Sequence, residues 1–336
     1  MSDLSIASAG LVSPLGIGVA QHVFFARAGA FVPPPPAFET AGGERVDALH
    51  CGFLGARLAM AERLVRLVEI AAEEALARWE ALAPAGRIAV ALVAPRRAGI
   101  DEGALRAAEG ALARRCRAPI ALTWYGEASA FAALAQVRAW LDADAASAAL
   151  LVGVDSFAST DGLAEDRRRA QSPFCPPALP PSEGAAAVML ARADRARALR
   201  AEAARVVFAG TAAGQGTDDD DEILDGAAMT GLLRALPPLR IALVVGQEHV
   251  DDLRAREWHL ASARAAPRFM PELRAETLER DTGRLGSAAG VAQLAYGVGL
   301  LRHRAAREVP PDAAFLAWAV SRDGLRGAAL LQGVPS

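Results

Sequence analysis

Four segments from the first part of this chain recur, in the same order, in its second part. Three of them are short apolar runs and one is a helix-like run of small residues. The matched pairs are residues 4–16 with 205–216, 86–95 with 239–248, 125–141 with 284–301, and 147–156 with 313–324. The shared order indicates a duplicated unit, and a period of about half the chain is too long for a solenoid of stacked short repeats.

Each copy of the unit reads strand, helix, strand, helix, strand. The strands are nearly continuous apolar runs, as expected where both faces of a sheet are buried. The helices, for example residues 63–79 and 195–204, combine Ala and Leu on one face with Arg and Glu on the other. This alternation predicts an α/β fold with mixed or parallel sheets. Residues 287–301 (SAAGVAQLAYGVGLL) carry the small side chains that a closely packed central helix needs.

The composition is that of a protein with a well-buried core, since 53% of its 336 residues are hydrophobic and 22% are charged. The net charge of −3 gives no field that would attract nucleic acid or an anionic membrane. No run reaches the roughly 18 apolar residues that a membrane-spanning helix needs. We therefore expect a chain that binds neither nucleic acid nor membrane.

The cysteines and basic residues exclude several kinds of site. Cys51, Cys116 and Cys175 are widely separated, with no CxxC pair and no spacing typical of zinc ligands. All 36 basic residues are arginine, so neither a lysine Schiff base nor a P-loop lysine can form. We expect no metal and no bound cofactor. The scattered cysteines, and residues 1–10 without the pattern of a signal peptide, favour a cytoplasmic location.

One short turn, residues 125–130 (YGEASA), has the character of a catalytic loop. It lies between the apolar run Pro119–Trp124 and a small-residue helix predicted over residues 130–141. Sharp strand-to-helix turns rich in small residues hold the nucleophile in many enzymes. The residue in that place here is Glu127, which is either catalytic or the mark of a site that has lost its chemistry.

Four further motifs carry a resemblance to a known family. They are residues 10–18 (GLVSPLGIG), 149–156 (ALLVGVDS), 181–190 (PSEGAAAVML) and 282–294 (TGRLGSAAGVAQL). In this order the chain resembles, over nearly its whole length, the thiolase superfamily and within it the β-ketoacyl synthases. The resemblance implies a duplicated fold, layered α-β-α-β-α, with two mixed sheets around central helices. It also implies two thiolase-like halves, residues 1–200 and 201–336, that form one compact unit.

The catalytic positions of that family are altered in this sequence. The family has a cysteine at the nucleophile turn, where this chain has Glu127, and a histidine in its Thr-Gly-His block, where this chain has Arg284. The lysine five residues earlier in the family is matched by Glu279. The second family histidine follows the strand Ile241–Val245, and His249 is a displaced substitute for it. Condensation of acyl chains is therefore not expected, and Ser129 has no neighbouring base in the sequence to make it a substitute nucleophile.

The turn is most similar to that of the chain length factors, non-catalytic partners of active ketosynthases that have Gly-Gln-Ala at this place. Glutamate keeps the size of glutamine and adds a charge that a helix N-terminus stabilises by about 0.3–1 kcal/mol. We predict that Glu127 caps the central helix rather than acting as a catalytic acid. Because Glu127 and Arg284 open matched helices of the two copies, we also predict that they form an ion pair that closes the former pocket.

Three functions from different classes follow from these observations. The first is a partner subunit that forms a heterodimer with an active ketosynthase, or a homodimer with itself, and that also contacts an acyl carrier protein. The others are a scaffold or adaptor for another protein, and residual chemistry in which Glu127 supports malonyl-thioester decarboxylation or hydrolysis.

For the dimer we predict an interface along the apolar strand, formed by Pro119, Ile120, Ala121, Leu122, Thr123 and Trp124. His22 lies among polar helix positions and is predicted to be on the surface.

Overall fold

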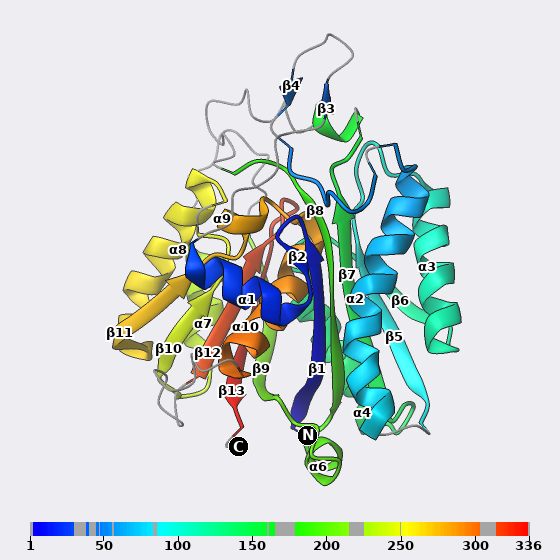
Figure 1. The fold of residues 1–336 in the computed structure, drawn as a ribbon. Helices are drawn as coiled ribbons and strands as arrows, with labels where there is room; N and C mark the ends of the chain where they lie inside the picture. The colour runs from blue at the N-terminus through cyan, green and yellow to red at the C-terminus, as the bar shows by residue number, and fades with distance from the viewer. Residues whose placement is uncertain are drawn as a thin grey trace.

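The structure of the protein is a computed structural model (Figure 1). It describes residues 3–29, 38–39, 45–46, 48–55, 57–82, 86–159, 161–164, 179–214, 225–248, 250–302 and 314–334. Cys175 and His249 lie outside these residues.

Ten long strands form the framework, in two sets of five that follow each other along the chain. The first strand set comprises β1 (Leu4–Ser13), β5 (Ile88–Ala94), β6 (Ile120–Tyr125), β7 (Ala148–Ser156) and β8 (Glu183–Arg192). The second strand set comprises β9 (Ala204–Ala213), β10 (Ile241–Val245), β11 (Phe269–Glu276), β12 (Ala314–Val320) and β13 (Leu325–Gly333). Short strands add local hairpins, and they are β2 (Gly16–Ile17), β3 (Phe38–Glu39) and β4 (Arg45–Val46).

The order of the strands confirms the duplication. The first set runs β6-β5-β7-β8-β1 and the second runs β11-β10-β12-β13-β9, so each strand of one set has a counterpart in the other. In both sets the first two pairings are parallel and the last two are antiparallel. The four repeated sequence segments fall on matching elements in this order.

The two sets are joined where β1 meets β9. Leu4, Ser5 and Ile6 pair with Val206, Arg205 and Ala204 in an antiparallel register. The two mixed sheets that the resemblance implied are therefore connected by hydrogen bonds into one continuous path. The division of the chain between residues 200 and 201 into two halves stays a prediction.

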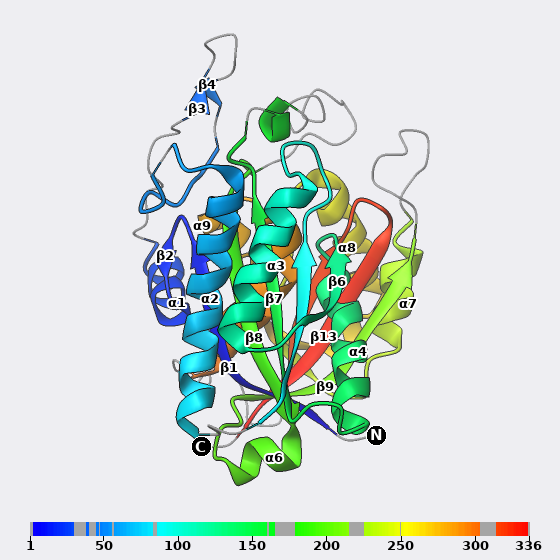
Figure 2. The same cartoon turned by 90° about the vertical axis from the view of Figure 1, so that its right-hand side faces the viewer.

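The helices complete five layers. They are α1 (Val19–Ala28), α2 (Met60–Leu82), α3 (Glu102–Cys116), α4 (Ser129–Asp142), α6 (Ala193–Ala198), α7 (Ala227–Arg234), α8 (Asp252–Arg264), α9 (Glu279–Thr282) and α10 (Ala289–Arg302). The outer layer of α2 and α3 packs on the first strand set, and α7 packs on the second and against α8. Between the sets lie α4 and α10, each in contact with strands of both (Figures 1 and 2). This is the α-β-α-β-α architecture predicted from the sequence.

Side-chain periodicity explains why each helix takes its place. In α2 the buried positions recur at helical spacing, and they are residues 63, 64, 67, 68, 71, 72, 75, 76 and 79. In α10, by contrast, every residue from Ala289 to Leu300 is buried, as a helix enclosed between two sheets requires. A β-carbon at Gly290 would lie 2.6 Å from the carbonyl oxygen of Glu127, so glycine allows the two central helices to meet at their N-terminal ends.

One buried ion pair ties the outer helix layer to the first strand set. Arg63 of α2 donates to Glu183 of β8 at 2.7 Å, and the two side chains are 1% and 0% exposed. Glu183 also accepts hydrogen bonds from the backbone N–H of Cys51 and from the hydroxyl of Ser156, each at 2.7 Å. The carboxylate is thus bonded through both oxygens, as a buried charge must be.

The prediction that His22 lies on the surface is wrong, because its side chain is fully buried on α1. Its Nδ1 lies 2.8 Å from the carbonyl oxygen of Gly18, and its Nε2 lies 2.7 Å from the hydroxyl of Ser13. Since a carbonyl oxygen only accepts, Nδ1 carries the proton and Nε2 accepts from Ser13 in the neutral ring. Burial lowers the pKa of His22 to about 4.

No helix in the described part of the chain is long and apolar enough to cross a membrane.

Candidate functional site

The turn that drew attention in the sequence forms a sharp strand-to-helix corner. Strand β6 ends at Tyr125 and helix α4 begins at Ser129. Between them Gly126 has a φ of 96°, a left-handed conformation that favours glycine. A β-carbon there would also lie 2.9 Å from the hydroxyl oxygen of Ser321. The corner places Glu127 beside the first turn of the central helix.

Glu127 is held by an arginine from an outer helix. Its Oε1 accepts from Nη2 of Arg254 at 3.1 Å, and the two side chains are 15% and 4% exposed. Nη1 of Arg254 donates to Asp251 at 2.8 Å, and Asp251 also caps α8 by accepting from the backbone N–H of Arg254. Arg254 donates further to the carbonyl of Val320 at 3.2 Å. One guanidinium therefore links the α4 corner, α8 and the end of β12.

The predicted ion pair between Glu127 and Arg284 is not formed. Nε of Arg284 donates to the carbonyl of Leu179 at 2.7 Å, and its backbone N–H donates to Pro180 at 2.8 Å. Arg284 is 4% exposed, and its guanidinium lies 5.7 Å from the ring centroid of Phe157. The repeat correctly placed Glu127 and Arg284 at the starts of matched helical blocks, but their charged groups have other partners.

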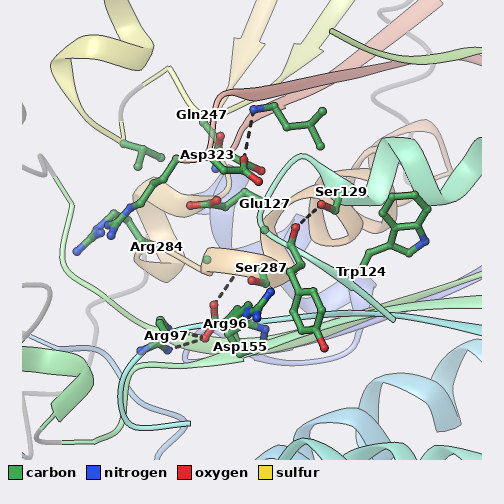
Figure 3. A pocket seen from close by; sticks show the side chains of 18 of the residues that line it. Arg96, Arg97, Trp124, Glu127, Ser129, Asp155, Gln247, Arg284, Ser287 and Asp323 are labelled. Atoms are coloured by element: carbon green, nitrogen blue, oxygen red, sulfur yellow. Dashed lines mark hydrogen bonds and ion pairs between the residues drawn. The ribbon is translucent and has the colours of Figure 1, made fainter. Parts of the chain in front are cut away.

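A pocket of about 680 Å³ remains beside Glu127, so the two residues do not close it. Figure 3 shows Glu127 and Arg284 on its wall together with side chains from both strand sets. It opens at the edge of the sheet where the parallel strands of both sets end, which is the usual place for a site in an α/β fold. Its lining includes Arg97, Trp124, Glu127, Asp155, Gln247, Arg254, Glu279, Arg284, Ser287 and Asp323.

A second ion pair lies at the floor of this pocket, between the end of β5 and its neighbour β7 in the first strand set. Nε of Arg97, which follows β5, donates to Asp155 of β7 at 3.2 Å. The other carboxylate oxygen of Asp155 accepts from the backbone N–H of Ser287 at 2.9 Å. The guanidinium of Arg97 also lies 3.5 Å from the ring centroid of Phe157. Asp155 is thus bonded through both oxygens and fixes the loop before α10 to the first strand set.

Glu279 is a buried acid of the pocket wall. Its Oε1 accepts from the backbone N–H of Leu285 at 2.8 Å, and its Oε2 has no hydrogen-bond partner among the described residues. Burial raises the pKa of Glu279 to about 7, and the nearby charge of Glu127 adds to the shift. Near neutral pH a large fraction of this carboxyl is protonated.

Comparisons with known proteins now bear on the site. No family model and no curated protein sequence matches this chain. Among solved structures, the ishigamide ketosynthase/chain length factor is similar at a TM-score of 0.76 and 22% identity, over 99% of this chain and 100% of that chain. A β-ketoacyl synthase from Burkholderia phymatum is similar at a TM-score of 0.70 and 17% identity, over 100% of both chains. The chain has the ketosynthase fold.

A further solved structure with this ketosynthase fold is a type II polyketide synthase acyl carrier protein in complex with its ketosynthase. It is similar at a TM-score of 0.73 and 12% identity, over 99% of both chains. These identities are low, and the likeness concerns the fold.

At the positions where the resemblance places ketosynthase chemistry, this ketosynthase fold carries different groups. The pocket lining in the described part of the chain contains no cysteine and no histidine. The place after β10 is taken by Gln247, which is 1% exposed and accepts from the backbone N–H of Val320 at 2.8 Å. In the sequence Gln247 lies two residues beyond that strand. The residue predicted for this place was His249, which lies outside the described residues.

Ser129 is buried, and its hydroxyl donates to the carbonyl of Tyr125 in the preceding turn. Nearby, the backbone N–H of Ala128 donates to the hydroxyl of Ser321 at 2.8 Å. In many acyl-transfer enzymes free backbone N–H groups hold an oxyanion. At Ala128 that donor is already taken.

Arg254 was missed by sequence reasoning because it lies within α8 and outside the motifs of the sequence. The one local signal was Asp251, an N-cap residue three positions before it. That the guanidinium reaches Glu127 depends on how α8 packs, which the sequence does not display.

The contacts of Glu127 and Arg254 predict unequal losses of stability when one or the other residue is replaced. Glu127→Gln leaves Arg254 its partner Asp251, so we expect a loss of about 1 kcal/mol in the free energy of unfolding. Arg254→Met leaves both Glu127 and Asp251 without their cation, so the expected loss is larger, about 2–3 kcal/mol. Urea denaturation of the two variants measures the difference. A greater loss in Glu127→Gln than in Arg254→Met would contradict this description.

The predicted interface strand lies at one end of the sheet. Among the described strands, β6 pairs only with β5. Pro119 and Ala121 are exposed, while Ile120, Leu122, Thr123 and Trp124 are half-buried. Trp124 also lines the pocket. The role of this strand as an interface stays a prediction.

Proposed function

We propose that this chain is a chain-length-factor-like partner subunit of an active ketosynthase, in fatty-acid or polyketide-type biosynthesis, without condensing activity of its own. The observation that carries the proposal is the carboxylate of Glu127, held by Arg254 at the corner where a ketosynthase has its nucleophile. A carboxylate is a poor acyl acceptor from a thioester, because the mixed anhydride that it forms is higher in energy. An ion pair further lowers its reactivity as a nucleophile.

The surroundings of Glu127 support the same proposal. The hydroxyl of Ser129 donates a hydrogen bond to a backbone carbonyl. Within the described residues no histidine lies on the pocket wall to activate this hydroxyl as a nucleophile. The N–H of Ala128 is occupied by Ser321. The corner therefore keeps the shape of a nucleophile turn while its groups serve to hold neighbouring elements together.

The two end strands of the sheet differ in a way that favours a partner at β6. Its residues Ile120–Tyr125 (IALTWY) include no charge and no proline. The matching end strand β11 carries Pro271, Glu272 and Arg274, all exposed. Proline and charges protect a sheet edge against pairing with another chain, and β6 has neither. We propose that β6 pairs with the corresponding strand of the ketosynthase.

The solved structures of similar fold are consistent with such an assembly. One is the ishigamide ketosynthase/chain length factor, and another contains an acyl carrier protein with its ketosynthase. By analogy we propose that an acyl carrier protein delivers acyl groups to the pair that this chain forms, and that the active subunit performs the chemistry.

Copurification tests the proposed assembly. Tagged full-length chain, coexpressed with a ketosynthase from its host that has intact Cys-His-His, is expected to yield a one-to-one complex by native mass spectrometry. Ala121→Asp, in the exposed edge of β6, is expected to abolish the complex because it would bury an unpaired charge. Ala275→Asp is the matched control, since Ala275 is exposed in the matching strand β11. A stable homodimer that forms no complex with any such ketosynthase would contradict the proposal and favour the scaffold or adaptor function.

The open pocket favours one second candidate, residual decarboxylation of a malonyl thioester. Arg284 supplies a buried cation on the pocket wall, where it could bind the malonyl carboxylate. Release of carbon dioxide from malonyl carrier protein by the isolated chain, lost in Arg284→Met and Glu127→Ala, would establish it. No release above a boiled control would remove it.

A further inference from the structure

An exposed arginine lies beside the C-terminal end of the edge strand β6. Arg96 follows β5, which pairs with β6 in parallel, and its guanidinium lies 5.7 Å from the ring centroid of Tyr125. The side chain is exposed, and no ion pair joins it to any described residue. The other charges at this end are mostly satisfied, since Arg97 binds Asp155 and Arg106 binds Glu102.

Exposed arginines also lie at the N-terminal end of β6. Helix α3 ends at Cys116, and Arg117 caps it in a left-handed conformation three residues before Ile120. Arg114 and Arg117 are exposed, and neither forms an ion pair within the part of the chain that the structure describes. Their neighbour Arg115 is bound by Glu73 and Glu80. Exposed arginines that form no ion pair with any described residue therefore flank both ends of the same edge (α3 contacts β6; Figure 2).

The centre of the edge carries the opposite charge. Glu109 of α3 accepts a hydrogen bond from the hydroxyl of Thr123 at 2.7 Å, so its carboxylate lies next to the middle of β6. Along the strand the sequence of charges is positive, negative, positive.

If two copies of this chain paired through β6, charges of the same sign would face each other. A second copy related by a twofold axis pairs β6 in the antiparallel sense, so the C-terminal end of one strand lies beside the N-terminal end of the other. Arg96 of one copy would then approach Arg114 and Arg117 of the other, twice in each dimer. Glu109 would approach its own counterpart near the axis. Like charges at an interface select against a partner.

We infer that the β6 edge is charged so as to reject a second copy of this chain and to accept a homologous strand that has carboxylates beside both of its ends. This inference rests on the proposed pairing through β6. It adds that the charges of the β6 edge determine which partner is bound. Exposed charges act weakly at each contact and are screened by salt, so the selection comes from several contacts together and is strongest at low ionic strength.

Charge reversal gives a direct test on the full-length chain by sedimentation equilibrium. In a twofold dimer, Arg96→Glu alone, or Arg114→Glu and Arg117→Glu together, turns the repulsive contacts between the strand ends into attractive ones. Each of these two variants is expected to tighten self-association about tenfold or more at low salt. The triple variant Arg96→Glu/Arg114→Glu/Arg117→Glu restores like charges and is expected to return to the weak self-association of the natural chain. Arg234→Glu, an exposed residue of α7, is the matched control and is expected to change nothing.

The complex with the ketosynthase is expected to respond in the opposite direction. Arg96→Glu, and Arg114→Glu together with Arg117→Glu, should each weaken it about tenfold at low salt, and high salt should reduce both effects. A natural chain that forms a tight homodimer, or reversals at either end that behave like Arg234→Glu, would overturn the inference. If the ketosynthase complex forms and is lost in Ala121→Asp while the reversals have no effect, the charge selection fails and the proposed function stands. If Ala121→Asp also has no effect on that complex, the pairing through β6 itself is refuted.

Discussion

Glu183→Ala is expected to lower the free energy of unfolding by about 3–5 kcal/mol, because it leaves Arg63 buried without its counter-charge. Arg63 is 1% exposed, so water cannot replace the lost carboxylate. The backbone N–H of Cys51 and the hydroxyl of Ser156 lose their acceptor in the same step. Because Cys51 precedes α2, which carries Arg63, the change loosens the outer helix layer from the first strand set.

Denaturant unfolding followed by circular dichroism measures this loss. Glu102→Ala is the control, because its ion pair with Arg106 is exposed and worth no more than about 0.5 kcal/mol. A loss in Glu183→Ala no larger than in this control would show that the buried pair does not hold the layers together.

Acid is expected to destabilise the fold through His22 before most carboxylates titrate. The pKa of the buried ring is about 4 against 6.5 for the free side chain, because burial disfavours the charged form. Between these values the unfolded chain binds a proton that the folded chain does not, so stability is present above pH 6.5 and falls as the pH drops toward 4. His22 alone accounts for a loss of roughly 3 kcal/mol over that interval.

His22→Gln isolates this contribution, since the glutamine does not titrate while the carboxylates are the same in both proteins. The free energy of unfolding is measured from pH 7.5 to 4.5 for both. The natural protein should lose stability more steeply, and the difference should develop below about pH 6.5. Parallel curves, or a His22 pKa near its free value by NMR, would contradict the buried neutral ring.

The fold was predictable because its two main signals are local and repeated. Continuous apolar runs such as residues 88–94 and 241–245 gave strands buried on both faces, and their matched order gave the duplication. The connection of both strand sets at β1 and β9 was not predictable, since it depends on how far two sheets bend toward each other. The small residues of α10 predicted a central helix correctly.

The candidate site was only partly predictable. The strand-to-helix corner gave the position of Glu127, and the repeat gave the position of Arg284. Which guanidinium Glu127 would bind depends on the reach of Arg254 from α8, a contact between segments 127 residues apart in the chain. His22 was misjudged for a related reason, because its polar sequence neighbours conceal that Ser13 and Gly18 offer it partners inside the hairpin.

The assay that tests the central claim most directly is condensation by the purified complex and by each subunit alone. With acyl and malonyl carrier protein, the complex is expected to condense, and this chain alone is expected to show no product. The complex that carries Glu127→Ala should retain condensation, while the complex whose ketosynthase lacks its cysteine should lose it. Condensation by this chain alone, abolished in Glu127→Ala, would contradict the account.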